Sequence, residues 1–301
     1  MTTTSADSGT FDNYGMTATE VTTLTVMSGA ISYVGTVSNI LVILTVLLTR
    51  QLRESCTAVL LASLSFCDVL FCALYVPLYI HDINNGSDTV IEAVRWKIGV
   101  GVFLASLNAE LMVSLDRFVY VCYPYSYINW TSTKDVVIAA LCAPYLFALV
   151  PILPLLFTRT PIYSFIYIAI VFAVILVLHL SMYRVAWRQS QRIDRQYPTP
   201  VWSPVHPRMP IWTKSTIAVA ITVMASFLCW APVVILPLIV PVTSPSFKRY
   251  SKVILAFPSL GAVTHPFIFC WKLMQFRKAL IACMRKLRNQ VRVAEMQITR
   301  D

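Results

Sequence analysis

The stretch LTVMSGAISYVGTVSNILVILTVLL, from Leu24 to Leu48, contains no charged residue. A helix needs about 20 mostly apolar residues to cross the hydrocarbon core of a bilayer. This stretch is long enough, so it predicts a helix that spans a membrane. The whole chain shares its character, with 57% hydrophobic and only 13% charged residues, whereas soluble domains contain roughly one quarter charged residues.

Apolar stretches of similar length recur along the chain between polar or proline-rich breaks. The predicted spans are Leu24–Leu48, Cys56–Ile80, Trp96–Cys122, Val136–Phe157, Ile162–Trp187, Ser215–Val240 and Val253–Trp271. They leave no room for a soluble domain. The sequence therefore predicts an all-α membrane protein, a seven-transmembrane helix bundle at 24–271, with an outer N-terminal tail at 1–23 and an amphipathic helix and tail at 272–301.

The distribution of Lys and Arg predicts how the bundle is oriented. Cytoplasmic loops carry an excess of these residues, and 18 of the 24 fall on the inner side if the N-terminus is outside. We therefore expect a multi-pass protein of the cell membrane with an extracellular N-terminus and a cytoplasmic C-terminus. The predicted loop His81–Arg95 then lies outside, which makes Asn85 of Asn85-Gly86-Ser87 a glycosylation acceptor. Residues 1–21 contain no Lys or Arg, so we expect no cleavable signal peptide.

Three ionisable residues lie inside predicted spans, where they cost free energy and are functional candidates. Asp68 lies in the second span, Glu110 in the third, and His265 in the seventh, next to Pro266. The alternative for each is a hydrogen-bonded structural group. We expect His265 to hydrogen-bond Asp68 or Glu110, which would join three spans in one polar network.

Two further motifs lie at points where a bundle could change shape. Asp116-Arg117-Phe118 ends the third span, where adjacent opposite charges can hold each other until a partner competes for the arginine. The alternative is that Arg117 is one more positive residue on the inner side. In the sixth span, Trp230 stands beside Pro232, which indicates a hinge because proline kinks a helix.

The segment after the last span has the pattern of a helix that lies on the membrane surface. Phe276, Leu280, Met284 and Leu287 recur at helical spacing, with Lys and Arg between them. Such a basic, amphipathic helix is typical of the interface with lipid. Cys283 stands beside the apolar stripe and is a candidate for palmitoylation.

Taken in this order, the motifs resemble the rhodopsin-like (class A) G protein-coupled receptors, over roughly Gly35 to Met284. Asn39 and Asp68 match the asparagine of the first helix and the aspartate of the second. Asp116-Arg117-Phe118 and Pro124 match the Asp-Arg-Tyr segment and the loop proline that follows it. The resemblance implies that this last segment faces a heterotrimeric G protein, together with Tyr183 in the fifth helix.

The resemblance also implies an activation switch in the last two helices. Cys229-Trp230-Ala231-Pro232 matches the toggle segment of the sixth helix, and His265-Pro266-Phe267-Ile268-Phe269 is a variant of the seventh-helix Asn-Pro-x-x-Tyr. The residues assigned to the switch are Trp230, Pro232, His265, Pro266 and Phe269. The residues assigned to a polar core, or an altered site for a sodium ion near Asp68, are Asn39, Asp68, Ser106 and Glu110.

Several departures from the family's pattern change these expectations. The cysteines for the disulfide to the second outer loop are missing, so we expect an open binding mouth. Gly99 stands where amine receptors have an aspartate, so a monoamine ligand is not expected. Glu110 replaces a leucine of the layer that keeps the receptor closed, from which we expect raised basal signalling. The shortness and the missing bridge would also suit a virus-captured or fast-evolving receptor.

The function implied by the resemblance is a receptor that signals to a heterotrimeric G protein through outward movement of the sixth helix. The ligand is unknown, or there is none; membrane lipid is the other expected partner, and nucleic acid is not expected. The sequence contains no nucleophile–base pair, phosphate-binding glycine loop or metal-ligand spacing, so an enzyme is not expected. Two alternatives stay open: a signalling-silent decoy or chaperone-like receptor, and a transporter or channel, although repeated halves are not visible.

Overall fold

The computed structural model describes residues 15–85, 89–131, 134–158, 162–196, 211–241 and 244–298. Nearly all of these residues are helical, and no strand occurs among them. Six helical stretches are long and apolar enough to cross a membrane, and Val137–Leu153 forms a shorter apolar helix. The chain is therefore a multi-pass membrane protein with the seven-helix bundle that the sequence predicted.

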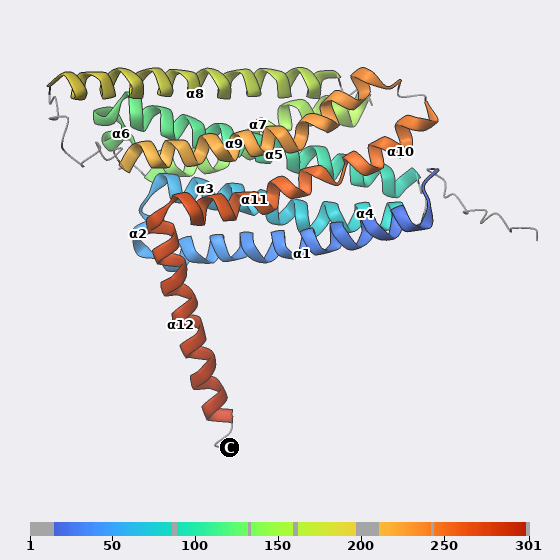
Figure 1. Cartoon of the computed structure of the whole chain (residues 1–301), viewed down its shortest axis with the longest axis horizontal. Helices are drawn as coiled ribbons and strands as arrows, with labels where there is room; N and C mark the ends of the chain where they lie inside the picture. Colours follow the sequence, from blue (N-terminus) through green and yellow to red (C-terminus); the bar gives the residue numbers. More distant parts are fainter. Residues whose placement is uncertain are drawn as a thin grey trace, which may run out of the picture.

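The long helices lie side by side along one axis (Figure 1). In chain order the elements are α1 (Ala18–Leu48), α2 (Arg50–Arg53), α3 (Cys56–Leu70), the π-helix η1 (Phe71–Tyr75), α4 (Val76–Asn85), α5 (Thr89–Cys122), α6 (Pro124–Thr131), α7 (Lys134–Thr158), α8 (Ile162–Gln196), α9 (Ile211–Ile239), α10 (Pro245–Ile254), α11 (Phe257–Lys272) and α12 (Met274–Ile298). Helices α2 and α6 and the start of α12 lie at one end of the bundle, and α10 and the end of α4 lie at the other.

The first span begins earlier than Leu24 because local polar groups cap the helix. The Thr17 side chain accepts a hydrogen bond from the Glu20 backbone N–H, and the Glu20 carboxylate accepts one from the Thr17 N–H at 2.8 Å. This reciprocal capping box satisfies two backbone donors that a helix start leaves free. Helix α1 therefore starts at Ala18, within the segment that the sequence assigned to the outer tail.

The second and third spans also extend beyond their predicted ends. Helix α4 continues to Asn85 and α5 begins at Thr89, so most of the predicted loop His81–Arg95 is helical. Asp82 and Arg95, whose charges had indicated loop residues, are instead buried and pair with each other. Asn85 is exposed at the last position of α4, while Gly86 and Ser87 of its tripeptide lie outside the described residues.

The seventh span consists of two helices rather than the single one expected at Val253–Trp271. Helix α10 ends at Ile254, and after two intervening residues α11 begins at Phe257 with a proline in its first turn. The proline has no N–H to donate and has its φ fixed, so it favours a helix start at this position. Helix α10 also covers most of the predicted outer loop Pro241–Lys252.

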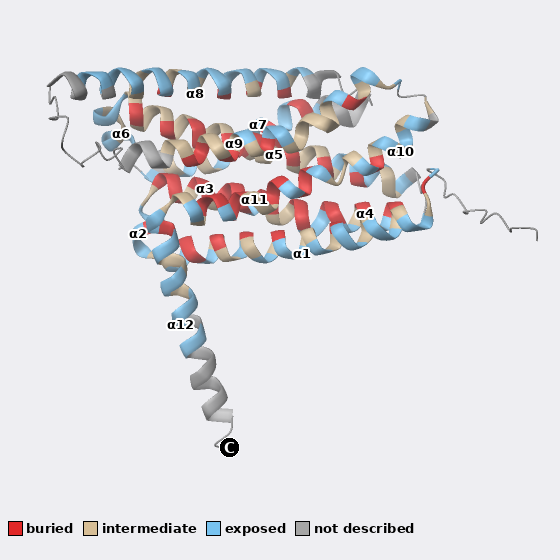
Figure 2. Cartoon of the chain, viewed as in Figure 1, coloured by how far each residue is buried: buried red, intermediate tan, exposed pale blue. Residues whose placement is uncertain are grey.

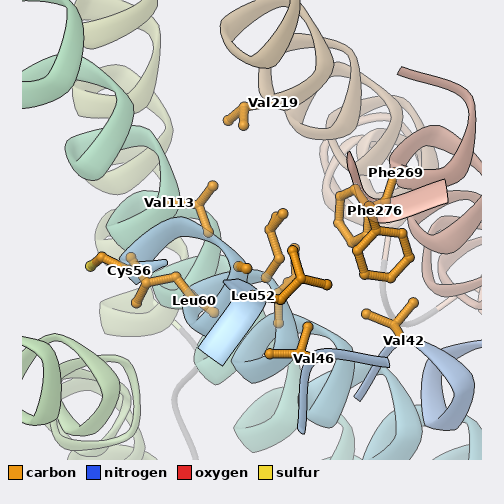
Figure 3. Close-up of a cluster of buried hydrophobic side chains, with 13 residues drawn as sticks. Val42, Val46, Leu52, Cys56, Leu60, Val113, Val219, Phe269 and Phe276 are labelled. Atoms are coloured by element: carbon orange, nitrogen blue, oxygen red, sulfur yellow. The ribbon is translucent and has the colours of Figure 1, made fainter. Parts of the chain in front are cut away.

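The core lies along the inner faces of the helices, where buried residues gather (Figure 2). One apolar cluster joins Val42 and Val46 of α1 to Phe269 of α11 and Phe276 of α12 (Figure 3). Phe276 is 2% exposed, so it fixes the start of α12 in the bundle. From there α12 runs crosswise to the other helices, the direction of a helix that lies along a membrane surface.

Close packing of α1 depends on the absence of a side chain at Gly35. A Cβ at this position would lie 2.6 Å from Cys72 Sγ and 3.2 Å from Val263 Cγ2. We expect Gly35→Ala to lower the free energy of unfolding by about 1–3 kcal/mol, because η1 or α11 must shift. Thermal unfolding of the purified protein measures this loss.

Gly29, on the same helix, provides the matched control. A Cβ there would meet its nearest neighbour, Ile80 Cδ1, at 3.9 Å, which is ordinary contact. Gly29→Ala should therefore leave the melting temperature unchanged or raise it slightly, because alanine favours a helix by up to about 1 kcal/mol. Equal melting temperatures for the two variants would contradict this account of the packing.

Candidate functional site

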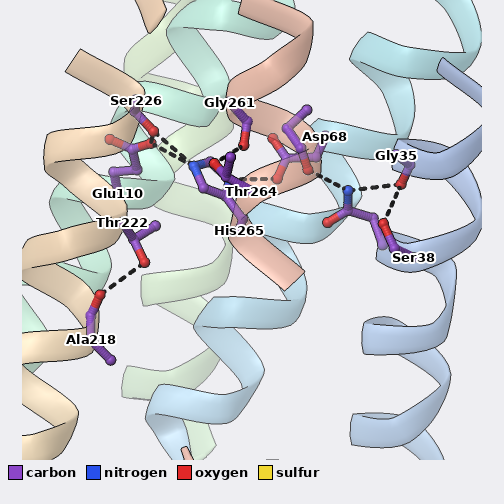
Figure 4. A network of polar contacts seen from close by, with 12 residues as sticks. Gly35, Ser38, Asp68, Glu110, Ala218, Thr222, Ser226, Gly261, Thr264 and His265 are labelled. Carbon is purple, nitrogen blue, oxygen red and sulfur yellow. Dashed lines mark hydrogen bonds and ion pairs between the residues drawn. The ribbon is translucent and has the colours of Figure 1, made fainter. Parts of the chain in front are cut away.

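A chain of buried polar groups crosses the middle of the bundle (Figure 4). His265 of α11 lies 2.7 Å from Asp68 of α3, measured from Nδ1 to Oδ2, and 2.8 Å from Ser226 of α9, measured from Nε2 to Oγ. Ser226 in turn donates a hydrogen bond to Glu110 Oε1 of α5. The network that the sequence predicted for His265 is present, and it reaches a fourth helix through Ser226.

This buried network contains two acidic side chains and only one imidazole. Two carboxylates, Asp68 and Glu110, lie on either side of one imidazole, and all three side chains are at most 5% exposed. His265 Nε2 lies 3.7 Å from Glu110 Oε1, so Ser226 provides the direct link. Glu110 Oε2 is buried and has no hydrogen-bond partner within the described part of the chain. Glu110 is thus the least well satisfied member of the network.

A small cavity opens beside these groups. It leaves about 20 Å³ for the centre of a water molecule, which is room for about one water. Its polar lining comes from Asp68, Ser106, Glu110, Ser226 and His265. Ser106, assigned to the polar core from the sequence, therefore lies on the same cavity as the two carboxylates.

These residues do not fit a sodium ion while His265 faces Asp68. Hard cations take oxygen ligands, and the cavity offers oxygens from Asp68, Ser106 and Glu110. The imidazole nitrogen, however, already occupies Asp68 Oδ2 at 2.7 Å. Gly261, which also lines the cavity, adds no side-chain oxygen. The imidazole takes the position that a cation would need.

Asn39 belongs to a different set of contacts. Its Nδ2 donates to the backbone oxygens of Gly35 at 2.9 Å and of Ala262 at 2.8 Å. It therefore ties α1 to α11 next to His265. Its Oδ1 has no hydrogen-bond partner among the described residues.

Trp230 lines the same cavity. Its ring stacks on Phe103 of α5 with centroids 3.6 Å apart, and it meets Phe71 of η1 edge-on at 5.9 Å. Pro232 follows it within α9, which continues to Ile239 without a break. The indole therefore touches two other helices directly beside a proline, as a hinge-linked switch requires.

The inner end of α5 holds Arg117 in a dense set of contacts. Arg117 Nη2 lies 2.6 Å from Asp116 Oδ2 and also contacts Thr57 of α3. Asp116 accepts further hydrogen bonds, at 2.7 Å from Thr57 and at 2.9 Å from the Tyr127 hydroxyl of α6. The Arg117 guanidinium also stands 4.7 Å from the centre of the Tyr120 ring. Arg117 is 5% exposed and is held by its own neighbours.

The sequence did not reveal Thr57 and Tyr127 as members of this group. Burial and the Asp116 carboxylate both raise the pKa of Tyr127, so the phenol stays protonated and donates to Asp116. The sequence contains little sign of these contacts, since Thr57 and Tyr127 lie 59 and 11 positions from Asp116. They reach the same carboxylate only because α3 and α6 pack beside the end of α5.

The other residues assigned to coupling and switching have contacts of their own. Tyr183 is 63% exposed and its ring stacks on that of Trp187. Phe118 packs edge-on against Tyr123, and exposed Pro124 begins α6. Pro266 and Phe269 are buried in α11, with the Phe269 ring stacked on that of His265 at 6.4 Å. Cys283 is half-buried on α12.

A second buried charged cluster was also missed by the sequence interpretation. Asp82 of α4, Arg95 of α5 and Lys252 of α10 meet at the opposite end of the bundle, and each is at most 3% exposed. The sequence assigned all three to outer loops. The only signal in the sequence was that apolar residues, such as Ile83, stand next to them. This pattern occurs at the ends of helices as well as in loops.

The comparisons with known proteins agree with the motifs. The family model described as 7 transmembrane receptor (rhodopsin family) matches residues 38–164, which include Asp68, Glu110 and Asp116-Arg117. A search for relatives among curated proteins gave no match. The resemblance that the motifs predicted is thus found by an independent comparison.

Proposed function

From this similarity to the rhodopsin family of seven-transmembrane receptors, which implies a signalling receptor rather than an enzyme, we propose that the chain couples to a heterotrimeric G protein. The observation that carries the proposal is the state of Arg117. It is buried, charged and held at the inner end of α5 by Asp116, Thr57 and Tyr127. Such a group can exchange one set of partners for another when a peptide enters.

The arrangement of these groups supports the following coupling mechanism. In the closed state Asp116 holds Arg117 while Trp230 fills the space between Phe103 and Phe71. Movement of α9 about Pro232 would carry its inner half outward and open a cleft beside Arg117. A G protein that binds only the open form shifts the population toward it.

We propose that Glu110 raises the population of the open form in the absence of ligand. A carboxylate with one unpartnered buried oxygen destabilises the packing around it. Its other oxygen bonds Ser226 of α9, the helix that has to move. The chain does not need a sodium ion for this step, because His265 already faces Asp68.

The orientation and the lipid contacts are part of the same proposal. The end that carries α2, α6 and the start of α12 would face the cytoplasm, as the excess of Lys and Arg indicates. Helix α12 would then lie along the inner leaflet, with Cys283 as its palmitoylation site. Exposed Asn85, at the other end, would be the glycosylation acceptor.

Arg117→Ala tests the proposal directly. We expect second-messenger output, measured in cells without added ligand and normalised to surface expression, to fall to the level of untransfected cells. The reason is that the guanidinium makes the contact with the incoming peptide. The fold should survive, because Asp116 keeps its hydrogen bonds from Thr57 and Tyr127.

The matched control is Arg184→Ala, an exposed arginine near the same end of the bundle. It should signal like the wild type. Equal output from wild type and Arg117→Ala would contradict coupling through this residue. Output at background from all three proteins would favour the signalling-silent alternative.

A further inference from the structure

The buried cluster of Asp82, Arg95 and Lys252 lies at the outer end of the bundle in the proposed orientation. Three elements contribute to it, namely α4, α5 and α10. Glu92, three residues before Arg95 on α5, has a side chain that is 46% exposed. The cluster therefore lies about one helical turn below the surface.

Both cations point at the same carboxylate oxygen. Lys252 Nζ lies 2.5 Å from Asp82 Oδ2, and Arg95 Nε lies 3.0 Å from it. The Asp82 side chain is completely buried, and the two cations are each 3% exposed. Glu92, the other carboxylate near Arg95, is 3.9 Å from Arg95 Nη2 and half-exposed, so it compensates little of this charge.

Arg95 also has hydrogen-bond donors that are not used. Its Nη1 and Nε are buried and make no hydrogen bond within the described part of the chain. The contact between Nε and Asp82 is an ion pair without the geometry of a hydrogen bond. A buried guanidinium normally has its donors satisfied, because an unpaired charged group in a low-dielectric site is strongly disfavoured.

We propose that this cluster binds a small monovalent anion, either a free inorganic ion or the carboxylate of an extracellular ligand. An anion next to Arg95 Nη1 would accept the hydrogen bond that this donor does not make within the described part of the chain. Guanidinium groups bind carboxylates and other oxyanions through their N–H donors.

The cluster contacts the aromatic groups that lead toward Trp230. Tyr79 donates a hydrogen bond from its hydroxyl to the Lys252 backbone oxygen at 2.8 Å. The Tyr79 ring stacks on Tyr75, and Tyr75 stacks on Phe71 at 4.6 Å. Phe71 in turn meets the Trp230 indole. A series of packed rings therefore connects the proposed anion site at Arg95 with Trp230 of the proposed switch.

Thermal unfolding of the purified full chain tests the site without requiring any signalling. The probes are sodium hexafluorophosphate, whose anion carries no carboxylate and coordinates weakly, sodium chloride and sodium acetate, at equal ionic strength. We expect chloride or acetate to raise the melting temperature above that in hexafluorophosphate, by about 3 °C at roughly ten times the dissociation constant. Arg95→Gln should abolish this rise, while Arg249→Gln, which removes an exposed arginine paired with Glu20, should keep it.

Asp82→Asn provides a second variant, which is expected to strengthen anion binding where Arg95→Gln abolishes it. Removing the competing carboxylate should lower the anion concentration needed for half the stabilisation by about tenfold or more. Stabilisation by chloride would identify an inorganic ion, and stabilisation by acetate alone would identify a ligand carboxylate. Equal melting temperatures in the three salts, or an Asp82→Asn variant that is destabilised equally in all of them, would overturn the proposal.

Discussion

His265→Asn is expected to melt well below the wild type in potassium buffer and to regain stability when sodium replaces potassium. The substitution removes the imidazole between Asp68 and Glu110 and leaves two buried carboxylates without their central partner. Removal of one partner of a buried ion pair costs about 3–5 kcal/mol, because the charge of the other partner is then uncompensated. The variant should therefore lose more stability than any other single change considered for this bundle.

Sodium should rescue the variant because the cavity then contains a suitable set of ligands. Asp68 Oδ2 is freed, and Ser106 and Glu110 supply oxygens from α5 on the same cavity. The melting temperature of wild type, whose imidazole blocks that oxygen, should be the same in sodium and potassium. Thermal unfolding in the two salts, at matched concentrations, measures both effects.

His179→Asn is the control for this experiment. His179 of α8 is half-buried, and its Nδ1 contacts the Ile175 backbone oxygen at 2.9 Å, with no carboxylate contact among the described residues. Its substitution should change stability little and should give no sodium effect. A His265→Asn variant that is as insensitive to sodium as the His179 variant would show that the imidazole does not occupy a cation's position.

Glu110→Leu is expected to lower ligand-free signalling by about tenfold and to raise the melting temperature by several degrees. Leucine removes the buried Oε2 atom, which has no hydrogen-bond partner among the described residues, and an unsatisfied buried group costs about 1–3 kcal/mol. Ser226 keeps its hydrogen bond with His265, so the variant leaves no new unpaired group on α9. A shift of about 1.4 kcal/mol toward the closed form corresponds to the tenfold change.

Glu110→Gln separates charge from polarity in the same position. Its amide can still bond Ser226 but carries no charge, so signalling should fall less than in Glu110→Leu. Second-messenger output and surface expression should be measured together for both variants. Basal signalling equal to that of wild type in Glu110→Leu would show that the carboxylate does not destabilise the closed form.

The number of membrane spans and the polar contact of His265 could be predicted from the sequence because they depend on local composition. A charge-free stretch such as Leu24–Leu48 can cross a bilayer only as a helix, since its backbone groups must bond each other. An ionisable group such as Asp68 inside a span needs a polar partner for the same reason, and His265 was one of few candidates. These conclusions required no knowledge of how the helices pack.

The ends of the helices were harder to predict, because charged residues usually mark loops between membrane spans. Asp82, Arg95 and Lys252 are charged yet lie inside helices, since they neutralise each other across three elements. Such compensation is invisible in one stretch of sequence. The sequence also gave no sign that the seventh span divides at Leu255 and Ala256, where two helices meet.

Only the tertiary structure decided which residues complete each site. Ser226 bridges His265 and Glu110 from α9, and Tyr127 reaches Asp116 from α6, although neither residue stood out in its own segment. Helical periodicity gives the faces of each helix, but the rotation and depth of neighbouring helices depend on their packing. The sequence by itself therefore determined a seven-helix membrane bundle with charges in its core, and the packing determined which of those charges meet.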